Sequence, residues 1–82
     1  MTHALKTHPE YFKAIVDGFK TFDIRINDRP FKPGDSILLQ EYKPDDKTYT
    51  GREWSGNISY ILYDDFPGLK KGYCILAIKE KE

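Results

Sequence analysis

A short alternating stretch at residues 21–26 constrains the fold of this chain more than any other feature. It follows Gly18 and reads Thr-Phe-Asp-Ile-Arg-Ile. Successive side chains of a β-strand point to opposite faces, so this stretch predicts a strand with one polar and one apolar face. We expect the apolar face to seal a core; it consists of Phe22, Ile24 and Ile26. The opposite face carries a hydroxyl, a carboxylate and a guanidinium, from Thr21, Asp23 and Arg25.

An amphipathic helix is predicted immediately before this strand. Thr7 and Glu10 have the spacing of a capping box, and Pro9 is tolerated in a first helical turn. Gly18 suits the left-handed position that ends a helix. Between these ends, apolar residues recur at helical spacing. They are Tyr11, Phe12, Ile15, Val16 and Phe19.

Four further strands are predicted, at residues 2–6, 36–42, 52–63 and 73–79. A type II turn is expected at residues 32–35, and Phe31 before it is expected to be a core residue. Gly56 indicates a bulge or a barrel corner in the long strand. Trp54, Ile58, Tyr60 and Leu62 share a parity in that strand, so we expect them on one face. The last strand is apolar on both faces, which predicts a central position in the sheet.

One helix and about five strands favour a mainly β (α+β) fold. We expect a small five-stranded β-barrel, closed or nearly closed, with the N-terminal helix packed beside it, because closure removes bare strand edges. An open α+β sheet is the alternative. The length of 82 residues predicts a single domain over residues 1–82.

Composition narrows the functional classes. Thirteen basic residues balance thirteen acidic residues, so any nucleic-acid binding must come from a local patch. The lone Cys74 excludes an internal disulfide, and its apolar neighbours predict a buried, inert thiol. His3 and His8 are too isolated for a metal site, so we expect no metal and no cofactor. The absence of a signal-like or membrane-spanning apolar run favours a cytoplasmic protein without a membrane partner.

The order of these features resembles the ASCH domain of the PUA-like superfamily. The resemblance rests on a helix, then Gly18-x-Lys20-Thr21-x-Asp23-x-Arg25, then Phe31-x-x-Gly34-Asp35 before an apolar strand. The resemblance covers nearly the whole chain. Within the ASCH family, the chain is similar to the small uncharacterised bacterial and phage branch. The resemblance implies a PUA-like barrel with a cleft beside the helix, and a role in binding RNA or modified nucleotides. The usual family pattern has Glu at the position of Asp23.

Four residues are therefore the candidate ligand- or RNA-binding residues: Lys20, Thr21, Asp23 and Arg25. The planar fork of Arg25 suits a phosphate or a base edge, and Asp23 could orient Arg25 or accept from an exocyclic amine. The structural alternative is a simple ion pair at the barrel mouth. Lys20 has the opposite strand parity, so it joins the site only if the strand begins after it.

Several other side chains could contribute to such a site. Aromatic residues offer stacking surfaces for bases, although we expect most of them to be core or barrel-wall residues instead. They are Trp54, Tyr42, Tyr60, Tyr63 and Tyr73. Loop cations could meet phosphates, with nearby carboxylates weakening the attraction. They are Arg29, Lys32, Lys70 and Lys71.

Two alternative functions stay open. Some small ASCH relatives are amidohydrolases that act on acetylated cytidine, and they are similar to this chain at Lys20. Their threonine nucleophile falls where this chain has Asp23, and a carboxylate cannot replace an alkoxide in that chemistry. We therefore expect an RNA- or nucleotide-binding module rather than an enzyme. A protein-interaction module of phage origin is the further alternative.

Overall fold

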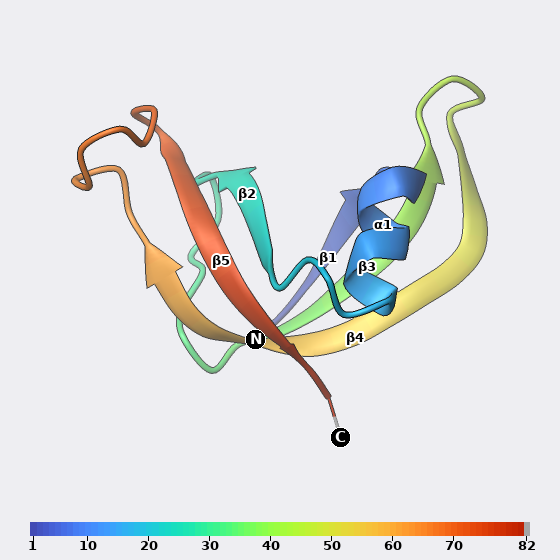
Figure 1. The fold of residues 1–82 in the computed structure, drawn as a ribbon, viewed down its shortest axis with the longest axis horizontal. Helices are drawn as coiled ribbons and strands as arrows, with labels where there is room; N and C mark the ends of the chain where they lie inside the picture. Colours follow the sequence, from blue (N-terminus) through green and yellow to red (C-terminus); the bar gives the residue numbers. More distant parts are fainter. Residues whose placement is uncertain (82) are drawn as a thin grey trace.

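The computed structural model describes residues 1–81, which form one helix and five strands (Figure 1). The elements are β1 (Thr2–Thr7), α1 (Pro9–Val16), β2 (Phe22–Ile26), β3 (Ser36–Lys43), β4 (Thr48–Leu62) and β5 (Tyr73–Glu80). The strand order in the sheet is β1-β3-β4-β5-β2. β1 runs parallel to β3, and the other pairs are antiparallel. Within the described residues, no helix is long and apolar enough to cross a membrane.

The sheet curls into a half-barrel, with the long β4 along its base (Figure 1). β1 and β3 rise on one side, β5 and β2 rise on the other, and α1 lies beside β1 and β3. The prediction of a mainly β fold with five strands in a barrel-like sheet and one helix is confirmed. The predicted central position of the last strand is confirmed, because β5 is an interior strand that pairs with β4 on one side and with the edge strand β2 on the other.

The core fills the concave side of the half-barrel. Its buried apolar side chains come from all the strands except β2, together with α1 and the loop before β3. They are Leu5, Phe12, Ile15, Phe31, Ile37, Leu39, Trp54, Ile58, Ile61, Cys74, Leu76 and Ile78. The prediction that Phe31 is a core residue is confirmed. The type II turn after it is also confirmed, because Gly34 has a φ of +93° and the Asp35 amide donates to the Lys32 carbonyl at 3.0 Å.

The beginning of α1 differs from the predicted capping box. His8 is the N-cap residue and makes no side-chain cap bond, whereas Thr7 is the last residue of β1 and is buried. Thr7 belongs to the strand because the Thr7 side chain faces the interior of the half-barrel. The end of the helix is as predicted, since Gly18 follows the C-cap Asp17 with a φ of +84°. Only Phe12 and Ile15 of the apolar stripe are buried.

β4 carries its bulge at a different residue from the one predicted. Gly56 pairs in register with both neighbouring strands, and the register shifts between Ile58 and Tyr60. The extra residue reverses the facing of the strand, so Ile61 is buried and Tyr60 is 63% exposed. Gly56 is needed for a different reason. A Cβ there would overlap the Trp54 ring and the Lys79 carbonyl oxygen.

Candidate functional site

The two faces of β2 are the reverse of the prediction. Asp23 is buried and Arg25 is half-buried on the concave side, whereas Phe22, Ile24 and Ile26 are exposed. The expectation that this apolar face seals the core is therefore wrong. β2 is an edge strand, and its inner face meets the edge of β1, where main-chain carbonyls require donors. The polar row supplies those donors, so it is the row that turns inward.

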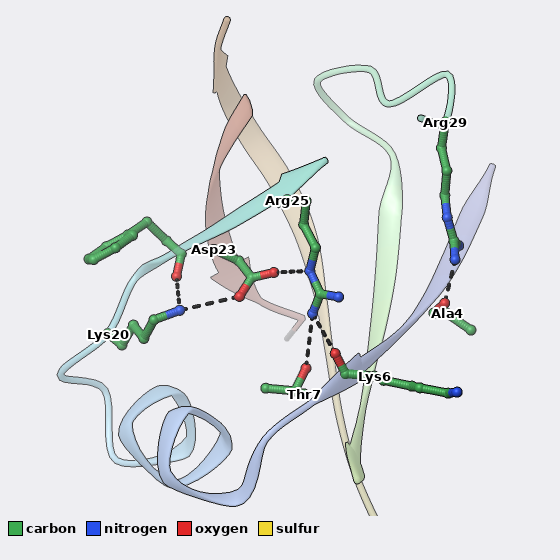
Figure 2. A network of polar contacts seen from close by, with 8 residues as sticks. Ala4, Lys6, Thr7, Lys20, Asp23, Arg25 and Arg29 are labelled. Atoms are coloured by element: carbon green, nitrogen blue, oxygen red, sulfur yellow. Dashed lines mark hydrogen bonds and ion pairs between the residues drawn. The ribbon is translucent and has the colours of Figure 1, made fainter. Parts of the chain in front are cut away.

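Asp23 lies at the centre of a compact ionic cluster (Figure 2). Its Oδ1 accepts from the Lys20 ammonium at 3.2 Å, and its Oδ2 accepts from Nε of Arg25. The ammonium of Lys20 also donates to the Phe22 carbonyl at 2.7 Å. The Asp23 side chain is 8% exposed, against 18% for Lys20 and 23% for Arg25. Two cations around one largely buried carboxylate leave the cluster with a net positive charge.

Lys20 reaches this cluster because it precedes the strand. β2 begins at Phe22, so the parity of the strand does not constrain Lys20. The turn after Gly18 instead folds the lysine side chain back onto Asp23. Sequence reasoning named this condition for Lys20, and the structure meets it.

Two arginines connect β2 and the loop after it to the edge of β1. Nη2 of Arg25 donates to the Lys6 carbonyl at 2.7 Å and to the Thr7 hydroxyl at 3.3 Å. Nη1 of Arg29 donates to the Ala4 carbonyl at 3.1 Å (Figure 2). We call the line along which Thr2–Thr7 and Phe22–Ile26 face each other the β1–β2 seam. Guanidinium side chains bridge this seam, whereas the neighbouring strands of the sheet are joined by backbone hydrogen-bond ladders.

Three adjoining hollows lie along the β1–β2 seam. The first, of about 430 Å³, is lined by Tyr11, Lys20, Phe22, Asp23 and Ile24. The second, of about 180 Å³, shares Tyr11, Asp23 and Ile24 with the first and also touches Arg25. The third, of about 250 Å³, shares Ile24 and Arg25 with the second and extends to Arg29 and Tyr73. We call the three together the seam groove.

Thr21 is the predicted site residue that the structure does not bring to the ionic cluster. It lines another hollow of about 250 Å³, on the other side of Lys20 from the cluster, together with Lys20, Trp54 and Ile78. Its carbonyl accepts from the Ile78 amide at 3.0 Å, which continues the pairing of β2 with β5. Of the four predicted residues, Lys20, Asp23 and Arg25 therefore lie together and Thr21 lies apart.

Two residues of the seam groove, Tyr11 and Thr7, are not among the predicted site residues. Tyr11 belongs to the predicted apolar stripe of the helix, but this residue is 49% exposed and lines the first hollow. Thr7 was assigned to a cap, but its hydroxyl accepts from Arg25. Arg29, which is expected to be a loop cation able to meet phosphates, lines the third hollow. No local pattern reveals these roles, because they depend on β1 lying opposite β2.

Cys74 lies opposite Arg25 in the register of β2 and β5 and is fully buried. Burial raises the pKa of its thiol, and the nearby charges of Asp23 and Asp28 raise that pKa further. The thiol is therefore protonated at neutral pH. The predicted inert, buried thiol agrees with this environment.

A second acidic residue lies away from the groove, where β3 begins. Asp35 accepts from Nε2 of His3 at 2.8 Å and from the Lys32 amide at 3.1 Å. The bond from His3 lowers the pKa of the Asp35 carboxyl, and the Lys32 amide and the N-terminal ammonium add to this, although burial opposes it. Among residues 1–81, no group of three His, Cys, Asp or Glu side chains is placed to hold a metal ion.

Comparison with known proteins identifies relatives of the chain but no activity. A family model described as "Domain of unknown function (DUF3850)" matches residues 2–78. The chain is also 32% identical, over 59 residues, to a protein of Escherichia phage P2 described as "Uncharacterized 12.9 kDa protein in GpA 3'region". This match covers 72% of the chain and 52% of the phage protein, so the chain spans about half the length of this relative. The expected similarity to an uncharacterised phage protein is confirmed.

Proposed function

The chain belongs to the DUF3850 family, and we propose that it is a small ASCH-like module of PUA-like fold that binds RNA or a nucleotide-like ligand. The ligand occupies the seam groove beside α1. The curled five-stranded sheet with a single helix is compatible with this fold. The charge and the aromatic lining of the groove support this class of ligand.

The first hollow of the groove carries the proposal. Two exposed rings line it, Tyr11 at 49% and Phe22 at 44% exposed, and the Lys20 ammonium lies near both. The ammonium is 5.6 Å from the centroid of the Tyr11 ring and 5.0 Å from that of Phe22. Unpaired bases stack on exposed aromatic rings, at about 1–3 kcal/mol per base. A cation beside such rings suits the phosphate that accompanies each base.

Asp23 has a positioning role in this proposal. Its carboxylate holds the Lys20 ammonium at the rim of the hollow and the Arg25 guanidinium within the seam. A carboxylate has about four acceptor positions on its two oxygens, so Asp23 also retains capacity for a donor from a base. The cluster thus combines an anion-binding side with an acceptor.

Affinity is expected to be modest and to depend weakly on salt. The chain has no net charge, and the cations of the groove are partly neutralised by Asp23 and Asp28. For single-stranded nucleic acid, the slope of log K against log salt concentration is about −0.7 per neutralised phosphate. One or two phosphate contacts therefore predict a slope of about −1.

Fluorescence polarisation of an end-labelled single-stranded RNA tests the proposal. Tyr11→Ala removes a stacking ring and should weaken binding about tenfold, within the 1–3 kcal/mol of a stacked base. Lys20→Gln should also weaken binding. Lys47→Gln is the matched control, because it removes one positive charge from the loop between β3 and β4.

Retained affinity in both Tyr11→Ala and Lys20→Gln would contradict the proposal, as would absence of binding by the native chain. A loss of equal size in Lys47→Gln would show attraction by charge alone. That result would also count against the seam groove as the binding site. Tyr11 is half exposed, so its loss leaves the core intact.

A further inference from the structure

We infer that the seam groove binds a single-stranded oligonucleotide along its length, as a chain of at least two nucleotides with Arg29 as a second phosphate contact. This inference rests on the proposed function and names the class of ligand more closely. A mononucleotide would occupy only the first hollow. An oligonucleotide would continue past Arg25 to the third hollow.

The continuity of the groove is the first observation. The first and second hollows share Tyr11, Asp23 and Ile24, and the second and third share Ile24 and Arg25. All three follow β2, whose five residues extend over about 16 Å at about 3.3 Å per residue. A duplex strand rises about 3.4 Å along its axis for each phosphate, and an extended single strand spaces its phosphates more widely, but a length of about 16 Å still exceeds one such spacing. The groove is therefore long enough for more than one nucleotide.

The positions of the cations are the second observation. Lys20, Arg25 and Arg29 lie at one end, in the middle and at the other end of the groove. The hydrogen bonds of Arg25 use Nε and Nη2, and the bond of Arg29 uses Nη1. A guanidinium has five N–H donors. With the bonds that residues 1–81 provide, both arginines therefore keep donors that could bind a phosphate. Cations in a row match the repeating charge of a nucleic-acid strand.

Aromatic rings at both ends are the third observation. Tyr11 and Phe22 are exposed at the first hollow, and Tyr73 lines the third hollow and is partly exposed. The Lys70 ammonium is 5.5 Å from the centroid of the Tyr73 ring, which repeats the pairing of ring and cation seen at Lys20. Two such pairs, separated by the length of β2, provide two places where a base could stack beside a phosphate.

A length series tests this inference. The probes are uridine 5′-monophosphate and oligouridylates of two, three and six nucleotides, with oligodeoxythymidylates as a second arm. Competition against the labelled RNA should show that the trinucleotide binds at least tenfold more tightly than the mononucleotide. Arg29→Gln should weaken the trinucleotide about threefold to tenfold and leave the mononucleotide unchanged. Arg29→Lys should restore part of the loss, and Lys47→Gln should change neither affinity.

The outcomes separate this inference from the proposed function. Equal affinity for the mononucleotide and the hexanucleotide would overturn the inference and leave the proposed function in place. An Arg29→Gln effect of the same size on every length would do the same. Failure of every probe to bind would overturn both. Equal binding of the deoxythymidylates would support the groove and show that the 2′-hydroxyl makes no contact of consequence.

Discussion

The β1–β2 seam and the body of the sheet formed by β3, β4 and β5 are held together differently. Backbone ladders join the strands of the body, and fully buried side chains such as Leu39 and Leu76 cover its concave face. In the seam, arginine side chains bind the carbonyls of Ala4 and Lys6. A ladder leaves no space between strands, whereas a side-chain bridge leaves hollows with charged walls. This difference is why we propose the seam as the ligand site.

The largest effect on stability should come from the body. Leu76→Ala removes a fully buried side chain of β5, and the cavity should cost about 3 kcal/mol of unfolding free energy. Urea denaturation followed by circular dichroism measures this loss. A cost below about 1 kcal/mol would show that the body is not the better packed region.

Arg25→Met should have a smaller effect, of about 2 kcal/mol. It leaves Asp23 largely buried with only Lys20 as a charged partner, and it removes the donors to the Lys6 carbonyl and the Thr7 hydroxyl. Lys13→Met is the control, because Lys13 makes an exposed ion pair with Asp17 on α1 and should contribute less than about 0.5 kcal/mol. Equal losses in the two variants would mean that the bridge across the seam contributes nothing beyond a surface pair.

The smallest stability effect should come from Asp35, and it should depend on pH. The folded state lowers the pKa of this carboxyl below its ordinary value of 3.8, chiefly through the bond from His3. A carboxyl whose pKa is lowered by folding stabilises the fold at pH values above its unfolded pKa. This contribution is lost as the pH falls through the folded pKa. The difference in urea midpoint between the native chain and Asp35→Asn should be larger at pH 5 than at pH 3, and it should shrink as the pH falls below about 3.8. An undiminished difference at pH 3 would contradict this assignment.

Local patterns predicted much of the body. Proline and glycine in the turn before Asp35 identified the type II turn, and Gly18 identified the end of the helix. These features depend on a few neighbouring residues, so the sequence contains the needed information. The position of the bulge in β4 does not follow from its residues. Gly56 looked like the bulge, but it is glycine because the Trp54 ring lies across it.

The seam was predicted less well because its contacts join distant residues. The alternation of β2 correctly placed Asp23 and Arg25 on the opposite face from Ile24. The prediction of which face points inward was wrong. The usual rule places apolar residues inside, and it fails here because the inner face of β2 meets the carbonyl edge of β1. That neighbour is about 18 residues away in sequence, and the assignment of Thr7 to a helix cap concealed it.

Amide chemical-shift mapping with single-stranded RNA tests the seam as the binding site most directly. Our account predicts shift changes at Tyr11, Lys20, Ile24 and Arg29, with little change at buried body amides such as Leu39 and Ile58. Changes confined to the loop between β3 and β4, or to body residues away from the groove, would contradict it.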